Sequence, residues 1–174
     1  TRLGSGHALS CVAEAVSGNF LVVYGDQVVE SQMVEEVATA QNADGSATAM
    51  AVVESDAASE YGAVRLFDDR VVELVERPKT DDYRMLNAGV YALDDGIFDA
   101  LERTDRVDGE IPLTRTLADR IDDTFIRGVV SDAAWVDATY PWDLLAVARS
   151  VLSAGDVPEP ERAPGVYVSP DARV

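Results

Sequence analysis

The pattern of apolar and polar positions predicts alternating helices and strands along the first part of the chain. Helical spacing covers residues 6–16 after a glycine-rich entry, and a continuous apolar run follows over residues 19–26. Ser31 is a suitable N-cap for a second helix that ends near residues 42–45, and residues 47–53 form another apolar run. Such runs are typical of strands covered on both faces, so this order favours an α/β fold with a mixed, mostly parallel sheet flanked by helices.

The middle of the chain has a different pattern. Residues 61–78 contain two short strand-like runs joined by Asp68 and Asp69, which predicts a β-hairpin. A further strand is expected over residues 85–94. The remaining predicted helices span residues 96–104, 110–123 and 141–155, and the remaining predicted strands span residues 124–130 and 133–139.

The composition changes after residue 153. Prolines and alternating charges over residues 154–164 predict a linker. In residues 165–174, Val168 and Val174 lie six positions apart, which is the period of a hexapeptide β-helix, although a terminal tail fits one interval equally well. We therefore expect one domain over residues 1–153, followed by the linker and a separate C-terminal segment.

The charge balance bears on the partners and the solvent. The chain has 32 acidic and 14 basic residues, a net charge of -18, and Lys79 is its single lysine. This charge repels nucleic acid and anionic membranes, so we expect neither as a partner. It also predicts a halophilic protein, whose carboxylates are screened by salt; an acidic protein of ordinary salt is the alternative.

Two further observations concern the location of the protein. No stretch approaches the roughly 20 apolar residues that a membrane-spanning helix needs. The single cysteine, Cys11, falls in a predicted helix and is expected to be a small buried hydrophobic residue. A cysteine of this kind is consistent with a cytoplasmic protein.

Asp26 and Asp137 are the first candidates for chemistry. Each follows an apolar run that is predicted to be a strand, and ligands of open α/β sheets bind outside the carboxyl ends of the strands. Two carboxylates at such ends would suit Mg²⁺, which takes hard oxygen ligands and shares them with phosphates. An aspartate at a strand end can also simply begin a turn, and the residues alone leave both interpretations open.

Other polar residues could bind a sugar phosphate. Glu76 and Asn87 could hydrogen-bond sugar hydroxyls, while Arg77 or Lys79 meets a phosphate, although each also suits a solvated loop. The glycines before His7 make a weak phosphate loop, because no strand precedes them and the GK[ST] ending of a P-loop is absent.

Seven short motifs occur in an order that resembles the sugar-1-phosphate nucleotidyltransferases. They lie within residues 2–153 and are LGSGHAL, YGD, YGAV, ELVERP, NAGVY, GEIPLT and WVDATYPWDLL. Within this family the chain looks most like the bifunctional N-acetylglucosamine-1-phosphate uridylyltransferases and their archaeal relatives. The resemblance implies a Rossmann-like nucleotidyltransferase fold, with the segment 165–174 as the first coil of a left-handed β-helix.

The resemblance also implies roles for individual residues. The residues that match nucleotide contacts are Gly4, Ser5, Tyr24, Gly25 and Asp26. The residues that match sugar-phosphate contacts are Gly62, Glu76, Arg77 and Asn87. Asp26 and Asp137 match the two metal ligands and are the expected catalytic residues. Arg77 stands where many relatives have lysine, and a guanidinium does not replace an ammonium in every contact.

The implied reaction converts an NTP and a sugar 1-phosphate into an NDP-sugar and pyrophosphate, with Mg²⁺ as the cofactor. UTP or dTTP would react with the 1-phosphate of glucose or N-acetylglucosamine, and the protein would be a homo-oligomer, such as a trimer formed through the β-helix. The signature glycine-rich loop of the family does not occur in this sequence. We therefore expect an N-terminally truncated catalytic domain that is inactive by itself. The alternative is a regulatory or scaffold protein that binds a sugar nucleotide without turnover.

Lowering the salt concentration is expected to destabilise the protein. With a net charge of -18 and one lysine, unscreened repulsion between carboxylates favours the unfolded chain. Thermal unfolding of the 174-residue chain in KCl, from molar to millimolar, should give a Tm that falls as the salt is diluted. A Tm that stays constant or rises on dilution would contradict the halophilic interpretation.

Overall fold

The computed structural model describes residues 3–41, 43, 48–155 and 157–173. The chain divides into two compact units, of which the first comprises Thr1–Tyr24 and Glu30–Ala133. The second comprises Gly25–Val29 and Ala134–Val174. Residues 42, 44 and 45, where the second predicted helix was expected to end, and Val174 lie outside the described residues.

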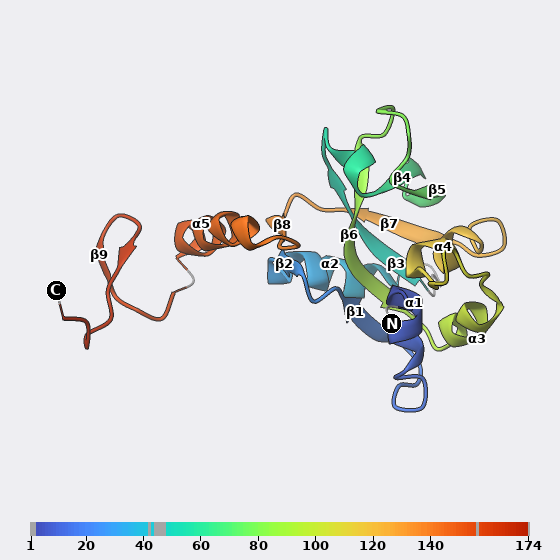
Figure 1. Ribbon diagram of the computed structural model, residues 1–174, viewed down its shortest axis with the longest axis horizontal. Helices are drawn as coiled ribbons and strands as arrows, with labels where there is room; N and C mark the ends of the chain where they lie inside the picture. The colour runs from blue at the N-terminus through green and yellow to red at the C-terminus, as the bar shows by residue number, and fades with distance from the viewer. Residues whose placement is uncertain (1–2, 42, 44–47, 156, 174) are drawn as a thin grey trace. The chain divides into compact units, whose positions relative to one another are not determined.

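A six-stranded sheet forms the centre of the first unit, and its strand order is β1-β6-β3-β7-β5-β4 (Figure 1). The strands are β1 (Phe20–Val23), β3 (Thr48–Glu54), β4 (Gly62–Phe67), β5 (Arg70–Glu76), β6 (Met85–Leu93) and β7 (Ile126–Val130). Strand β6 also pairs with β4, so it has three partners in the sheet.

The prediction of a mostly parallel sheet is wrong. Among the strands of the described residues, only β3 and β7 pair in parallel, and the other pairings of the sheet are antiparallel. Strand β6 runs antiparallel to both of its main neighbours, β1 and β3. Most residues of β6 are buried. A continuous apolar run therefore indicates that both faces of a strand are covered, but it does not indicate whether the strand is parallel or antiparallel to its neighbours.

The predicted hairpin is confirmed. Strands β4 and β5 pair antiparallel up to Phe67 opposite Arg70, so Asp68 and Asp69 form the turn. Asp68 has a φ of 53°, and aspartate tolerates this left-handed conformation better than most residues. The short polar turn sets the register next to it, and a register shift between Arg65 and Leu66 then brings Gly62 opposite Glu76.

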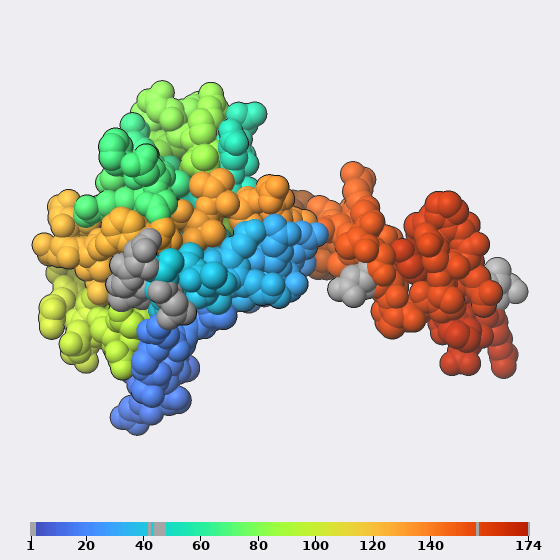
Figure 2. All heavy atoms as spheres, turned by 180° about the vertical axis from the view of Figure 1, so that it is seen from behind, coloured from blue at the N-terminus to red at the C-terminus, as the bar shows by residue number. Residues whose placement is uncertain are grey.

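Helices cover the sheet. Helices α1 (Ser5–Ser10), α3 (Gly96–Arg103) and α4 (Leu113–Ala118) lie together, and their apolar side chains share a core with β3 and β6 (Figure 1). Helix α2 (Ser31–Gln41) buries Met33 and Val37 and contacts β3, β6 and β7. Figure 2 shows α2 in light blue against the orange segment that contains β7, where the Ser131 hydroxyl donates a hydrogen bond to Glu36. A short 3₁₀ helix, η2 (Ala58–Glu60), precedes β4.

The first helix is shorter than predicted. It ends at Ser10, and both Ser10 Oγ and Cys11 Sγ bond to the backbone oxygen of His7. Side chains that take up helix carbonyls in this way compete with continuation of the helix. The prediction that Cys11 is buried is wrong, because its side chain is exposed beyond the helix end.

The second unit contains two small antiparallel sheets. Strand β2 (Gln27–Val29), which the sequence pattern did not predict, pairs with β8 (Trp135–Asp137). The 3₁₀ helix η3 (Pro141–Asp143) leads into helix α5 (Leu144–Ala154), and β9 (Glu161–Ala163) then pairs with β10 (Val166–Tyr167). Strand β9 lies inside the segment that was expected to be a linker. The β-helix stays a prediction.

None of the helices among the described residues combines the length and the apolar character needed to span a bilayer.

Candidate functional site

Gly62, Glu76 and Asn87 lie together on three strands of the first unit. Gly62 is opposite Glu76 in the β4–β5 pairing. A Cβ atom at Gly62 would lie 3.4 Å from Glu76 Oε2 and 3.6 Å from Asn87 Nδ2. The missing side chain therefore leaves a space between a carboxylate and an amide. The three residues that the resemblance grouped as sugar contacts also lie together in the structure.

Thr114 belongs to the same cluster, although the sequence did not single it out. Its hydroxyl donates a hydrogen bond of 3.4 Å to Glu76 Oε2 from the first turn of α4. The GEIPLT motif contains this threonine, so the motif was the available signal. The packing of α4 against β5 is needed to show which residue of the motif faces the Glu76 carboxylate.

Arg77 borders the cluster in a strained backbone conformation. Its φ is 42°, and its N–H donates to the Tyr61 oxygen at 2.9 Å. Its guanidinium Nε lies 4.0 Å from Glu76 Oε1, with 77% of the Arg77 side chain exposed. An ion pair this exposed contributes little to stability, so the side chain can move to an anion. Lys79 is also exposed, in the segment that connects β5 and β6.

Asn87 is held by two hydrogen bonds. Its Oδ1 accepts from the Gly89 N–H at 3.2 Å, and its Nδ2 donates to Tyr91 Oη at 2.6 Å. The Tyr91 ring lies 5.5 Å from the Tyr24 ring, centroid to centroid. Burial raises the pKa of the Tyr91 hydroxyl well above 10.0, and a hydrogen bond with Tyr24 and the charge of Glu76 add to this, while the Asn87 bond opposes it.

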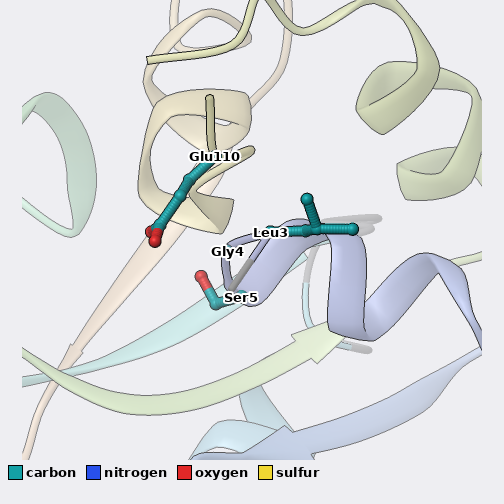
Figure 3. A pocket seen from close by; sticks show the side chains of 4 residues that line it. All are labelled: Leu3, Gly4, Ser5 and Glu110. Atoms are coloured by element: carbon teal, nitrogen blue, oxygen red, sulfur yellow. The ribbon is translucent and has the colours of Figure 1, made fainter. Parts of the chain in front are cut away.

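Two of the predicted nucleotide-binding residues, Gly4 and Ser5, line a pocket of about 370 Å³. Leu3, Gly4, Ser5 and Glu110 line it, and in Figure 3 the Ser5 hydroxyl and the Glu110 carboxylate point to the same side. Gly4 has a φ of 92° and a ψ of 166°, a conformation that is essentially restricted to glycine. A Cβ on Gly4 would lie 2.5 Å from Ile111 O, so the close approach of the two backbones also requires glycine.

Ser5 connects this pocket to the Glu76 cluster. Its Oγ accepts the N–H of Leu113 at 3.0 Å, at the start of α4, and the next residue of α4 is Thr114. The hydroxyl thereby satisfies one of the helix N–H groups that have no partner within the helix. The first turn of one short helix thus contacts one residue of each group, Ser5 and Glu76.

Asp26 and Asp137 lie on paired segments of the second unit. Strand β8 ends at Asp137 opposite Gln27, and the Ala138 N–H donates to the Asp26 backbone oxygen at 2.8 Å. Asp137 Oδ1 accepts from Gln27 Nε2 at 3.2 Å and from Thr139 Oγ1 at 2.8 Å. The pairing is antiparallel, so Asp26 stands just before a strand and not at the carboxyl edge of a parallel sheet. Gly25 precedes Asp26 in this unit, whereas Tyr24 belongs to the first, where its N–H donates to Gly89 O at 3.0 Å.

The oxygen atoms around Asp137 have the chemistry that Mg²⁺ requires. Gln27 Oε1 is buried and accepts no hydrogen bond within the described part of the chain, which leaves a hard oxygen on the amide that is bonded to the Asp137 carboxylate. No cluster of three or more His, Cys, Asp or Glu side chains that could hold a metal occurs among the described residues. A magnesium ion here would therefore take its remaining ligands from phosphates or water, as is usual for this metal.

Comparison with known proteins identifies related sequences. A family model described as nucleotidyl transferase matches residues 2–153. The bifunctional protein GlmU of Methanococcus maripaludis strain S2 is 30% identical over 156 residues, which cover 87% of this chain and 36% of that protein. GlmU of Methanococcus vannielii is 32% identical over 161 residues, with 87% and 37% covered. The chain thus spans little more than a third of the length of these relatives.

Solved structures share the fold. A UDP-glucose pyrophosphorylase complexed with UDP-glucose superimposes with a TM-score of 0.77 at 18% identity, over 86% of this chain and 62% of that one. The UDP-glucose pyrophosphorylase of Acinetobacter baumannii gives 0.73 at 22% identity, over 87% and 57%. At these identities the likeness concerns the fold alone, and it confirms the predicted α/β nucleotidyltransferase fold.

Raising the pH above 10 is expected to destabilise the protein through Tyr91. Because its pKa is raised on folding, the unfolded chain loses this proton first. The contribution is complete below about pH 10 and is lost as the pH rises towards the pKa of the folded state, by up to about 1.4 kcal/mol per pH unit. Urea denaturation between pH 9 and 11 measures this slope.

Two variants separate Tyr91 from other groups that titrate at high pH. Tyr91→Phe should have a shallower slope than the parent chain over this pH range. Tyr83→Phe, which removes the hydroxyl of another buried tyrosine, should keep the slope because Tyr91 is still present. Equal slopes in all three proteins would show that Tyr91 does not carry the effect.

Proposed function

Because the chain belongs to the nucleotidyl transferase family, we propose that it is part of an enzyme that transfers a nucleotidyl group from an NTP to a sugar 1-phosphate. The products are an NDP-sugar and pyrophosphate. The observation that carries this proposal is the cluster at Gly62, where a carboxylate and an amide flank a space that a single Cβ would fill. A carboxylate accepts and an amide donates hydrogen bonds, which together suit the hydroxyl groups of a sugar.

The substrates proposed are UTP or dTTP with the 1-phosphate of glucose or N-acetylglucosamine. The names of the GlmU relatives and of the UDP-glucose pyrophosphorylases support a sugar nucleotide as the product. Gly4 and Ser5, at the pocket that Glu110 also lines, would contact the base, and Tyr24 and Gly25 would lie beside the nucleotide sugar.

The sugar phosphate would be bound by the cluster on β4, β5 and β6. Glu76 would accept hydrogen bonds from the sugar hydroxyls and Asn87 would donate one, while Arg77 or Lys79 would neutralise the phosphate. The exposed side chain of Arg77, which has only a long contact to Glu76, can reach an anion without breaking a strong ion pair.

Asp26 and Asp137 would hold Mg²⁺, and the bound ion would neutralise charge on the phosphate oxygens. The bonds from Gln27 and Thr139 keep the Asp137 carboxylate in place for this role. The reaction needs no protein nucleophile, because the oxygen of the sugar phosphate attacks the α-phosphorus; the protein contributes positioning.

The proposal extends to the longer protein of which this chain would be part. That protein would supply the glycine-rich loop, so the 174-residue chain would be inactive alone. It would form a homo-oligomer through the β-helix and would be cytoplasmic, where an exposed thiol such as Cys11 stays reduced. A non-catalytic protein that binds a sugar nucleotide is the alternative, and the presence of both aspartates argues against it.

Substituting Gly62 by alanine is expected to weaken sugar-phosphate binding without unfolding the protein. The new Cβ would fill the space between Glu76 and Asn87 at ordinary contact distances of 3.4 to 3.6 Å. Calorimetric titration of the chain with glucose 1-phosphate and N-acetylglucosamine 1-phosphate should show affinity reduced by about tenfold or more, since hydrogen bonds to a charged group are lost.

Gly18→Ala is the matched control. Gly18 has a φ of 67° and open space around it, so alanine there should lower the stability by about 1–2 kcal/mol and leave binding unchanged. The proposed sugar site would be contradicted by tight binding to the Gly62→Ala variant.

The metal site is tested with Mn²⁺ as a paramagnetic substitute for Mg²⁺. Titration should broaden the amide resonances of residues 25–29 and 134–139 before those of other segments, and EDTA should restore them. Asp137→Asn and Asp26→Asn should each remove this selective broadening. Asp132→Asn, which changes an exposed aspartate of the first unit, should not. Uniform broadening along the chain would show that the acidic surface binds the ion without a defined site.

A further inference from the structure

Asn87 and Tyr91 meet although they lie four residues apart on one strand. In a regular strand, positions four residues apart are separated by about 13 Å, and both side chains are on the same face. Here Nδ2 of Asn87 and Oη of Tyr91 are 2.6 Å apart. The residue midway between them is Gly89, which has a φ of 74° and no side chain, and the register with β3 shifts at this point. A local bend of β6 therefore brings the two side chains together.

The hydrogen bonds fix the orientation of the Asn87 amide. The Gly89 backbone N–H can only donate, so the atom that faces it at 3.2 Å must be the oxygen, Oδ1. The amide nitrogen then faces Tyr91 Oη, which accepts one of its two hydrogens. The Tyr91 ring in turn packs against the Tyr24 ring, with centroids 5.5 Å apart. The Gly89 N–H thus determines which end of the Asn87 amide faces Tyr91.

We propose that Tyr91 is a positioning residue for sugar-phosphate binding, because its hydroxyl holds the Asn87 amide beside Gly62 and Glu76. This inference rests on the proposed function of that cluster. The second hydrogen of Asn87 Nδ2 has no acceptor among the described residues, and the same nitrogen lies 3.6 Å from the place that a Gly62 Cβ would occupy. A sugar hydroxyl in that space would accept this hydrogen.

The contribution of the Tyr91 hydroxyl can be measured separately from the packing of the Tyr91 ring. Tyr91 is completely buried and its ring belongs to the core formed with Met50 and Leu93. Phenylalanine would fill that core equally well, whereas a buried hydroxyl is unfavourable unless it is hydrogen-bonded. The hydroxyl therefore contributes through its bond to Asn87, and its removal leaves the Asn87 amide held by the Gly89 N–H alone.

Binding measurements on the 174-residue chain test this role. The chain is titrated with glucose 1-phosphate and with N-acetylglucosamine 1-phosphate, with and without Mg²⁺ and UTP. Tyr91→Phe should raise the Kd for the sugar phosphate about tenfold and leave the Kd for UTP unchanged, since one positioned hydrogen bond is lost. Tyr83→Phe, which removes the hydroxyl of another buried tyrosine of the first unit, should leave both Kd values unchanged.

A double-mutant cycle distinguishes positioning from packing. If Tyr91 acts through Asn87, then Tyr91→Phe should not weaken binding further in the Asn87→Ala background. A further tenfold loss of affinity in that background would overturn the inference, and so would an unchanged Kd in Tyr91→Phe. Neither result would contradict the proposed function as long as the wild-type chain binds the sugar phosphate. Failure of the wild-type chain to bind either sugar phosphate would overturn the proposed function and the inference with it.

A measurement on the wild-type chain does not depend on any variant being folded. The side-chain amide of Asn87 should give two separate NMR resonances, with the hydrogen that faces Tyr91 protected from exchange with water. Rapid exchange of both hydrogens would mean that the hydroxyl does not hold the amide, and would overturn the inference.

Discussion

The first unit depends on the insertion of strand β6 between β1 and β3. Strand β3 pairs with β6 on both sides of the bend at Gly89, whereas the other partners of the two parts differ. Residues 90–93 pair with β1, whereas Met85 and Leu86 pair with β4. The bend therefore lies between the part of the strand that pairs with β1, which Tyr24 follows, and the part that pairs with β4, which carries Gly62. The candidate residues of both regions are positioned by one strand because that strand changes direction.

Helix α4 provides the second constraint on the site. It has only six residues, too few to be stable by itself, so its position is set by its contacts. Ser5 binds the N–H of Leu113, and the close approach of Gly4 to Ile111 fixes the segment just before the helix. Thr114 then reaches Glu76. The glycine-rich entry of the chain thus contributes to the sugar cluster, although its sequence has a weak likeness to a phosphate loop.

The sequence predicted the type of most elements but not the direction of the strands. The hairpin at Asp68 was predictable because a two-residue polar turn between short runs permits one pairing only. Strand direction was not, because burial on both faces produces the same apolar run in parallel and antiparallel strands. Strand β2 escaped prediction, since its three half-buried residues give too short a pattern. The cluster of Gly62, Glu76 and Asn87 was predicted through motif order, whereas the role of Thr114 required the contact between α4 and β5.

The missing side chain of Gly62 leaves the proposed sugar site open in the free protein. The space between Glu76 and Asn87 exists because a side chain is missing from a paired strand, so no side chain has to move before a ligand enters. Two hydrogen bonds hold the Asn87 wall in place, and the Thr114 hydroxyl orients the Glu76 carboxylate on the other side. A site of this kind is preorganised: little conformational entropy is lost when it is filled, and selectivity then depends on how well the hydroxyl pattern of the ligand fits a rigid frame.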